Sequence, residues 1–263
     1  MLGRFLRPFM GLKQLYPFYW KLYRLSLKGM NIGSGGGVTS SGEINSLYYV
    51  KAHSPQNARL VIFDVGANKG QYTKNLLAHL GNTDTDIHCF EPGHETFRIL
   101  AGELGGRTNI TLNNFGLSDK KSEDMLYYDK AGSGLASLYK RQLEYFNIDF
   151  EQSEPVMLDT LDSYIVAKGI IRIDLLKLDV EGNELNVLAG AQKALSEGII
   201  RAIQIEFGGC NLDSRTFMRD FWNMLHKDFV MYRIMKNGFV EIAKYDEMLE
   251  IFTTTNFFFV KRQ

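Results

Sequence analysis

The stretch Val61-Ile62-Phe63-Asp64-Val65-Gly66-Ala67-Asn68-Lys69-Gly70 decides the fold of this 263-residue chain. An apolar run rich in β-branched residues ends there in an acid and a glycine-spaced turn, and helical periodicity follows at Tyr72 and Leu76. This change of period predicts a strand, a tight loop and a helix. Gly66 and Gly70 allow a sharp turn and a close approach to a ligand, because a Cβ at either position would collide with the ligand or require an unfavourable φ.

A second apolar run, Ile87-His88-Cys89-Phe90-Glu91-Pro92, follows about twenty residues later. It predicts a neighbouring strand with Glu91 at its carboxyl end. In nucleoside-binding α/β folds an acid at this place accepts hydrogen bonds from both ribose hydroxyls. The pattern G-x-G-x-x-G does not occur in the chain, which disfavours NAD as the ligand.

Strands and helices alternate over most of the remaining sequence. We expect strands at 60–65, 86–91, 110–115, within 174–182, and at 202–207, 229–235 and 254–261, and helices at 70–80, 94–104, 184–195 and 214–227. This order predicts a doubly wound α/β fold, with a mostly parallel seven-stranded sheet, helices on both faces and an antiparallel C-terminal strand. A β-hairpin followed by a helical or mobile insertion is expected within about 120–157, and a small hairpin or helix between the last two strands.

The first 50 residues differ in composition from the rest, so we expect an arm over 1–50 and one domain over 51–263. Residues 1–30 contain six Lys or Arg, seven aromatic residues and no acid. This composition suits a helix on a membrane surface, but we favour an amphipathic helix folded back on the domain with its basic side in water. The Gly/Ser-rich residues 31–42 predict a flexible connection, since a phosphate-binding loop would need a preceding strand and a closing Lys-Ser or Lys-Thr pair.

The composition of the chain disfavours nucleic-acid-binding proteins, proteins with metal or redox cysteines, and proteins with a membrane span. Lys plus Arg and Asp plus Glu each total 30, so there is no general attraction to nucleic acid, and we expect no nucleic-acid partner. Cys89 and Cys210 follow no metal or redox spacing and are expected to be reduced packing thiols of a cytoplasmic protein. Charged residues and prolines interrupt the apolar runs near the N-terminus, so neither a signal peptide nor a membrane span is expected.

Taken together, these segments resemble the FkbM family of methyltransferases, within the class I fold that binds S-adenosylmethionine. The matching segments are FDVGANKGQYT (63–73), CFEPGHETF (89–97), NNFGLSD (113–119), LDTLDSY (158–164), LLKLDVEGNELNVLAGA (175–191) and IQIEFG (203–208). They cover most of residues 60–210, and the combination is more specific than any one glycine motif. The first 50 residues and the segment near 130–150 match loosely, so we expect substrate choice to reside there.

The resemblance implies a donor site at the carboxyl ends of the first strands. The loop that follows the first strand would hold the methionine portion, Glu91 the ribose hydroxyls, and residues 117–119 the adenine. The residues assigned to the donor in this way are Asp64, Gly66, Asn68, Gly70, Glu91, Leu117, Ser118 and Asp119.

Acids at the carboxyl ends of strands supply the candidate catalytic groups. Methyl transfer to an alcohol needs a positioned base, and we assign this role to Asp179, with Glu181 and Glu206 close by. Crowded carboxylates raise one another's pKa, which suits a base that works near neutral pH. Two alternatives remain at this point: a divalent cation held by the three acids, which we do not favour, or a structural role in which Glu181 and Asn183 cap the next helix.

We therefore predict an S-adenosylmethionine-dependent O-methyltransferase, and the family resemblance implies that its acceptor is a hydroxyl of a sugar, glycan or secondary metabolite. The alternatives are methylation of an amine or carboxylate of a small molecule, and a nucleoside-binding module without turnover. The basic, aromatic arm slightly favours an anionic or lipid-linked glycan at the inner membrane surface, with peripheral contact through residues 1–30. His53 and His94 are further candidate bases, without a visible partner in the sequence.

Overall fold

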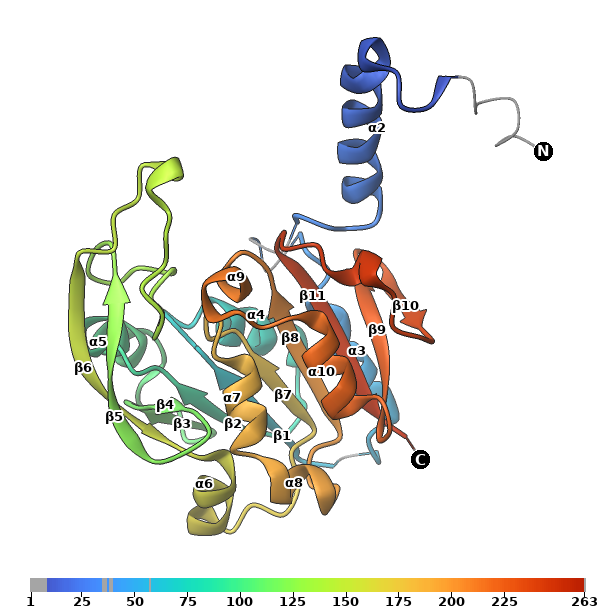
Figure 1. Cartoon of the computed structure of the whole chain (residues 1–263). Helices are drawn as coiled ribbons and strands as arrows, with labels where there is room; N and C mark the ends of the chain where they lie inside the picture. The colour runs from blue at the N-terminus through green and yellow to red at the C-terminus, as the bar shows by residue number, and fades with distance from the viewer. Residues whose placement is uncertain (1–8, 35–36, 38–39, 57, 263) are drawn as a thin grey trace.

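The computed structural model describes residues 9–34, 37, 40–56 and 58–262. Within these residues, eight strands form one sheet in the order β10-β9-β11-β8-β7-β1-β2-β3 (Figure 1). The strands are β1 (Leu60–Val65), β2 (Thr85–Phe90), β3 (Ile110–Asn113), β7 (Leu175–Leu178), β8 (Ala202–Phe207), β9 (Phe229–Met235), β10 (Gly238–Ile242) and β11 (Thr255–Lys261). All seven predicted strands are present. An eighth, β10, lies in the segment where a small hairpin or helix was expected, and it pairs antiparallel with β9.

The sheet is parallel from β8 through β7, β1 and β2 to β3, while β11 pairs antiparallel with both β8 and β9. The chain moves outward from β1 to β3 and then returns to the other side of β1 with β7. Ligands of open α/β sheets bind outside the carboxyl ends of the strands at such a reversal. In this protein the reversal lies between the loops that follow β1 and β7.

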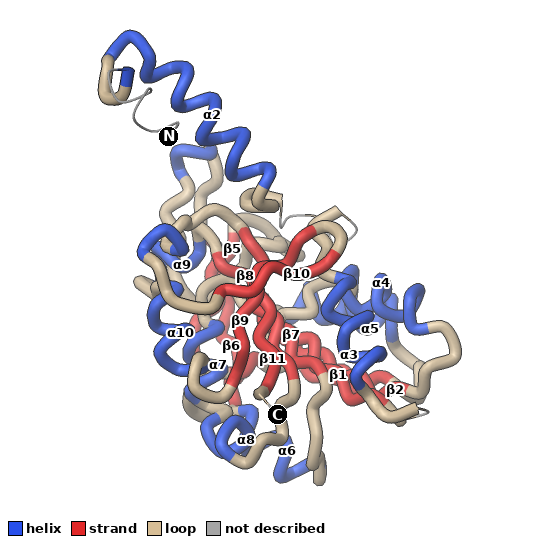
Figure 2. The backbone as a smooth tube through the Cα atoms, turned by 90° about the vertical axis from the view of Figure 1, so that its right-hand side faces the viewer, coloured by secondary structure: helices blue, strands red, loops and turns tan. Residues whose placement is uncertain are grey.

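Helices cover both faces of the sheet, as Figure 2 shows from the side. One face is covered by α3 (Ile44–His53), α4 (Gln71–Leu80) and α5 (His94–Leu104), whose apolar side chains share one core cluster. The other face is covered by α6 (Leu161–Lys168), α7 (Glu184–Ala189), α8 (Gln192–Ser196) and α10 (Met218–Leu225). Cys89 and Cys210 are buried free thiols. The predicted doubly wound α/β fold is confirmed.

The segment after β3 forms a second, three-stranded sheet in the order β4-β6-β5. It contains β4 (Gly116–Leu117), β5 (Ser122–Tyr128) and β6 (Gln152–Asp159). The sequence predicted a hairpin followed by an insertion, and this order is wrong, because β5 pairs antiparallel with β6 across residues 129–151. The insertion therefore extends from the turn of the hairpin, and its tip carries the short 3-10 helix η3 (Glu144–Phe146).

Two predicted helices are interrupted. The helix expected over 184–195 is divided into α7, which ends at Ala189, and α8, which begins at Gln192. Gly190, between them, lies so close to another segment that a Cβ would stand 2.0 Å from the Ser118 carbonyl oxygen. The helix expected over 214–227 begins at Met218, after the short α9 (Cys210–Ser214). Arg215 separates the two with a φ of 56°, a left-handed conformation that a continuous helix does not contain.

The N-terminal arm does not fold back on the domain, so the interpretation favoured from the sequence is wrong. In the arm, whose first eight residues lie outside the described part of the chain, the structure places η2 (Lys13–Leu15) and α2 (Tyr16–Gly29), neither of which contains a buried residue. Figures 1 and 2 both show α2 extending away from the body of the molecule. By contrast, α3 packs against the sheet, so the boundary predicted at residue 50 falls inside a domain helix.

The connection predicted as flexible is partly docked. Asn31 is buried, and its Nδ2 donates hydrogen bonds to the carbonyl oxygens of Ser41 (2.7 Å) and Ile234 (3.0 Å). Residues 35–36 and 38–39 lie outside the described part of the chain.

Among the helices of the described residues, none is both long and apolar enough to cross a bilayer.

Candidate functional site

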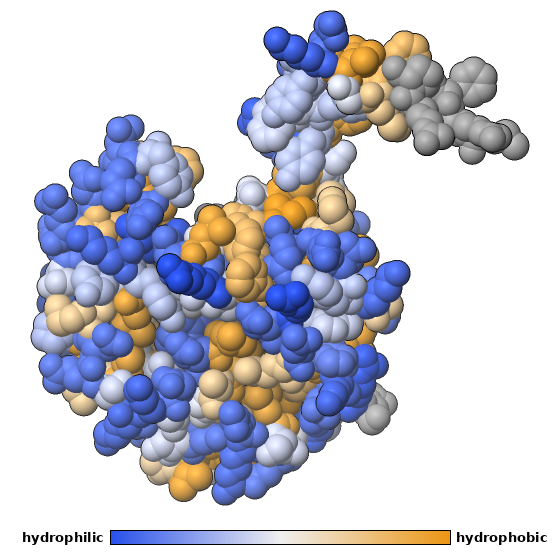
Figure 3. Space-filling view, viewed as in Figure 1, coloured by the Kyte–Doolittle hydropathy of each residue, from blue (hydrophilic) through white to orange (hydrophobic). Residues whose placement is uncertain are grey.

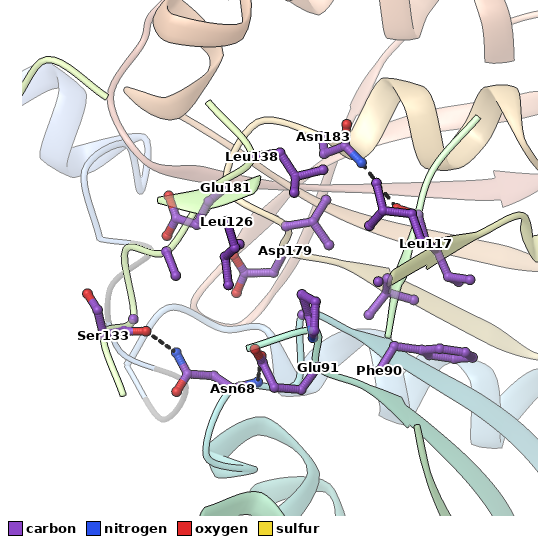
Figure 4. A pocket seen from close by; sticks show the side chains of 18 residues that line it. Asn68, Phe90, Glu91, Leu117, Leu126, Ser133, Leu138, Asp179, Glu181 and Asn183 are labelled. Carbon is purple, nitrogen blue, oxygen red and sulfur yellow. Dashed lines mark hydrogen bonds between the residues drawn. The ribbon is translucent and has the colours of Figure 1, made fainter. Parts of the chain in front are cut away.

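A cavity of about 590 Å³ lies at the point where the strand order reverses. The cavity is lined by the loop after β1, the end of β2, β4, the loop after β7 and part of the insertion. Figure 4 shows Glu91, Leu117, Asp179 and Asn183 around this space, which we call the first cavity.

Glu91 anchors the loop after β1 to the end of β2. Its Oε2 accepts a hydrogen bond from the backbone N–H of Asn68 (3.0 Å), and its Oε1 accepts one from Gly93 (2.9 Å). Burial raises the pKa of Glu91 to about 7, although these two backbone donors act in the opposite direction. Each carboxylate oxygen has a further lone pair, so the carboxylate can still accept hydrogen bonds from a ligand.

Gly66 is required by the close approach of two loops. It has a φ of 83°, and a Cβ built on it would lie 1.8 Å from the Asp179 carbonyl oxygen. The cause is the pairing of β1 with β7, which places Val65 beside Leu178 and brings the two following loops together. Asn68 also has a left-handed conformation, with a φ of 49°, and its side-chain Oδ1 accepts a hydrogen bond from the backbone N–H of Lys69 (2.7 Å).

A second cavity of about 1120 Å³ adjoins the first. Residues common to both walls are Gly66, Asn68, Gly134, Asp179 and Glu181. The rest of the second cavity is lined by α4, the end of β8, the loop before β11 and Glu43. Asp179 and Glu181 therefore stand at the boundary between two adjoining cavities.

Lys177 is a buried ammonium group that contacts two of the predicted acids. Its Nζ donates a hydrogen bond to Asp179 Oδ2 (2.9 Å) and lies 3.8 Å from Asp64 Oδ1. Burial by itself would lower the pKa of Lys177, but the carboxylates of Asp179, Asp64 and Glu43 outweigh it and raise the pKa above its ordinary value. Lys177 is therefore charged and fixes the orientation of the Asp179 carboxylate.

Glu181 is bound to the insertion through a buried arginine. Arg141 Nη1 donates a hydrogen bond to Glu181 Oε2 (2.6 Å), and Ser137 Oγ donates one to the Glu181 carbonyl oxygen (2.7 Å). Arg141 also forms an ion pair with Asp213 (3.4 Å). Burial and the neighbouring Asp179 raise the pKa of Glu181 to about 8, against the opposite effect of Arg141. The insertion thus forms part of the site through specific polar contacts.

The three predicted catalytic acids converge. One carboxylate oxygen from each of Asp179, Glu181 and Glu206 lies within 4.8 Å of the others. Burial, Asp179 and Glu181 raise the pKa of Glu206 well above its ordinary value, which favours its protonated form. The spacing is compatible with a single divalent cation, but Lys177 and Arg141 already supply positive charge to the same acids.

Of the eight donor residues predicted from the family resemblance, four line the first cavity and four do not. Gly66, Asn68, Glu91 and Leu117 line the first cavity. The remaining four lie outside its wall: Asp64 and Gly70 beneath the loop, Ser118 behind Leu117, and Asp119 at the surface.

Asp64 and Gly70 support the loop from below. Asp64 is fully buried, and its Oδ2 accepts a hydrogen bond from Thr73 Oγ1 (2.7 Å). Gly70 precedes α4 with a φ of 80° and packs against α5, where a Cβ would meet Leu100 and Leu104. Both residues thus shape the loop after β1 from below its ligand-facing surface.

The sequence analysis missed four residues that line these cavities. Lys177 could have been found as a charged residue inside the apolar run Leu175–Leu178. Glu43 and Arg141 come from segments with no motif, and only the fold brings them to the second cavity. Asn183 lines the first cavity and donates a hydrogen bond through Nδ2 to the Leu117 carbonyl oxygen (3.1 Å), so it joins the loop after β7 to β4.

The two candidate histidine bases lie outside both cavities. His94 Nδ1 lies 2.6 Å from Glu154 Oε2, and the histidine is exposed. His53 stacks on Tyr49 at the opposite end of the sheet, beside a separate cavity. Neither imidazole faces the three acids, so Asp179 remains the candidate base.

Both the sequence and the fold of this chain are similar to those of known proteins. The family described as "Methyltransferase FkbM domain" matches residues 64–241. The chain is similar to 31-O-demethyl-FK506 methyltransferase FkbM of Streptomyces tacrolimicus, with 32% identity over 158 residues, covering 51% of this chain and 60% of the relative. It is also similar to 2-O-methyltransferase NoeI of Sinorhizobium fredii (strain NBRC 101917 / NGR234), with 25% identity over 147 residues, covering 52% and 59%.

The match therefore spans about three fifths of the length of each of these relatives. Among solved structures, the fold is similar to methyltransferase FkbM from Methylobacillus flagellatus KT, with a TM-score of 0.50 and 16% identity. That similarity covers 82% of this chain and 47% of the other.

Proposed function

This chain belongs to the FkbM family of methyltransferases, and we propose that it transfers a methyl group from S-adenosylmethionine to a hydroxyl of a sugar-like acceptor. One observation carries the proposal: Asp179 and Glu181 stand at the boundary between the two cavities. A donor in the first cavity and an acceptor in the second would meet beside these carboxylates.

The residues of the first cavity fit an S-adenosyl donor. Glu91 presents a buried carboxylate that can accept hydrogen bonds from two ribose hydroxyls. Leu117 and Pro92 offer apolar surface for the adenine, and Gly66 leaves room for the methionine portion where the two loops meet. When bound, S-adenosylmethionine supplies a methyl group on a positively charged sulfonium, which is activated for displacement.

The acids at the boundary supply what an alcohol acceptor needs. The hydroxyl proton must leave in or near the transition state, and a positioned carboxylate can accept it. Asp179 is the group best held for this role, because the Lys177 ammonium fixes its orientation from behind. The raised pKa of Glu206 favours its protonated form, which can donate a hydrogen bond to a neighbouring hydroxyl of the acceptor.

The polar side chains of the second cavity favour a polyol. Acids that line it are Glu43, Asp179, Glu181 and Glu206, whereas its cations are Lys177 and Arg141. Carboxyl groups, whether ionised or protonated, form good hydrogen bonds with hydroxyls. Both curated relatives carry names of O-methyltransferases, which supports a hydroxyl acceptor for this chain as well.

The experiment is a transfer assay with methyl-labelled S-adenosylmethionine and a panel of neutral sugars, each paired with its deoxy analogue. Replacement of Asp179 by Asn should lower turnover by roughly 10²- to 10⁴-fold, the contribution of a general base. Its affinity for S-adenosylhomocysteine should stay close to that of the parent. Glu123→Gln, at an exposed position on β5, serves as the matched control and should leave turnover unchanged.

Other outcomes would support the alternatives. Nearly full turnover by Asp179→Asn would point to an amine or carboxylate acceptor, because such a group needs less help from a base. Tight binding of the donor product without labelled product from any acceptor class would favour a nucleoside-binding module.

A further inference from the structure

Helix α2 is an exposed aromatic helix with no partner in the described part of the chain. The side chains of Tyr16, Phe18 and Leu25 are 65%, 61% and 67% exposed. Figure 3 shows the arm standing clear of the body, with apolar and basic residues side by side on its surface. A contiguous exposed apolar surface of this kind marks an interaction site.

The charges of α2 are confined to one stripe. Lys21, Arg24 and Lys28 follow the spacing i, i+3 and i+7, which places them on one side of a helix. Aromatic and aliphatic side chains occupy most of the remaining circumference, and residues 9–30 contain no acid. A helix with Lys and Arg on its polar face and Trp, Phe and Leu elsewhere is typical of those that bind the headgroup region of a bilayer.

The base of the arm lies beside the mouth of the second cavity. The backbone N–H of Gly33 donates a hydrogen bond to the Thr254 carbonyl oxygen (2.9 Å), and Thr254 lines that cavity. The buried Asn31 holds the end of α2 to β9 and to Ser41. The arm is therefore attached at the edge of the sheet where the site opens.

The tip of the insertion is a second exposed aromatic group at this end of the molecule (Figure 1). Tyr145 and Phe146 are 69% and 64% exposed, and their rings lie 4.5 Å apart. The tip and the arm come from distant parts of the sequence, yet both project beyond the edge of the sheet that carries the two cavities.

We propose that α2 and the aromatic tip at Tyr145 and Phe146 form a docking surface for an anionic lipid bilayer. The charge pattern favours an anionic lipid surface as the partner, because Lys21, Arg24 and Lys28 form a basic stripe and residues 9–30 contain no acid to neutralise it. Anionic headgroups neutralise the stripe, and the aromatic side chains enter the headgroup region.

When the protein is docked in this way, the edge of the sheet that carries the two cavities lies closest to the lipid. An acceptor attached to a lipid would then reach the second cavity without leaving the membrane surface. This last step rests on the proposed methyl transfer, whereas the docking itself does not, so vesicle binding and turnover are measured separately.

The test uses the full chain and vesicles of phosphatidylcholine, with or without about one third phosphatidylglycerol. The parent should co-sediment with the anionic vesicles at low salt and dissociate at high salt. Lys21→Ala/Arg24→Ala/Lys28→Ala should lower the partition coefficient by roughly a hundredfold, since each basic residue near the surface contributes about tenfold or less. The matched control replaces three exposed lysines elsewhere, Lys121, Lys168 and Lys193, and should bind as the parent does.

Two further variants measure the contribution of apolar contacts to vesicle binding separately from that of charge. Phe18→Ser/Trp20→Ser should lower binding by roughly tenfold or more, because exposed aromatic surface no longer enters the bilayer. Tyr145→Ser/Phe146→Ser should lower it severalfold. In a Trp222→Phe background, Trp20 is the remaining tryptophan, and its emission should shift to the blue with anionic vesicles.

Several results would overturn the proposal. The parent could fail to bind anionic vesicles at low salt, or the triple basic variant could bind as well as the parent. A parent that forms a dimer, dispersed by Phe18→Ser/Trp20→Ser and indifferent to vesicles, would show that α2 pairs with a second copy. If Tyr145→Ser/Phe146→Ser bound anionic vesicles as well as the parent does, the inferred orientation of the two cavities toward the lipid would be wrong.

Discussion

The buried carboxylate of Glu91 both stabilises the backbone around the first cavity and faces the ligand that we expect there. Its two oxygens hold the N–H groups of Asn68 and Gly93, and it forms part of the wall of the first cavity. Burial raises its pKa to about 7, so the carboxylate is only partly ionised at neutral pH without a ligand. A ligand that donates hydrogen bonds to it favours the ionised form.

The affinity for S-adenosylhomocysteine should therefore depend on pH. The bound state has the deprotonated Glu91, and the free protein takes up a proton as pH falls through about 7, so affinity should weaken by roughly tenfold between pH 8 and pH 6. Calorimetric titrations across this range measure the effect. Glu91→Gln should bind more weakly and show a flat profile, and an equally steep profile in that variant would assign the proton to another group.

The sequence predicts the acids of the site better than its cations. Asp179 directly follows β7 and Glu206 lies near the carboxyl end of β8, so their place at the shared edge of the sheet follows from the strand pattern alone. Lys177 lies within a strand that is buried on both faces, where a charged residue is explained only by its contacts with Asp64 and Asp179. Arg141 reaches the site by tertiary packing of the insertion, which no local pattern encodes.

The loops after β1 and β7 form one unit, joined at Gly66. Gly66→Ala should destabilise the protein by more than about 1 kcal/mol, because the new Cβ meets the Asp179 carbonyl oxygen and φ is positive. It should also weaken donor binding, since Asp179 has to move. Gly102→Ala is the control: this glycine lies inside α5 with open space around it, and alanine should stabilise the helix by about 0.5 to 1 kcal/mol. Thermal denaturation of both variants compares them, and equal stability would contradict the role of the close approach.

The insertion is held to the site by Arg141. Arg141→Ala removes the partner of Glu181 and Asp213, so the segment 129–151 should be cleaved faster in limited proteolysis. Lys140, the exposed residue beside Arg141, provides the control, because Lys140→Ala should be cleaved at the same rate as the parent. An unchanged cleavage rate in Arg141→Ala would show that apolar packing alone holds the insertion.

At the level of elements, the sequence predicts the strands well and several helices and connections poorly. The apolar runs of the parallel strands are distinct because both of their faces are buried. The break at Gly190 lies where this residue packs against Ser118, and the insertion is placed by pairing of β5 with β6. Both contacts join residues distant in sequence, which helical or strand periodicity does not report.

The whole molecule consists of an α/β domain with its site at one edge of the sheet and an exposed arm attached beside that site. Amphipathic composition predicted that the arm is helical but not that it stands free, because packing on the domain and contact with a membrane require the same kind of apolar surface. The position of the arm thus became clear only from the structure.

The most direct measurement of the central claim is calorimetric titration of the full chain with S-adenosylhomocysteine, alongside Glu91→Ala. The account predicts micromolar binding by the parent and clear loss of affinity in the variant, because the ribose loses its acceptor. A well-folded parent that does not bind S-adenosylhomocysteine would contradict the assignment of the first cavity as the donor site, and with it the proposed methyl transfer.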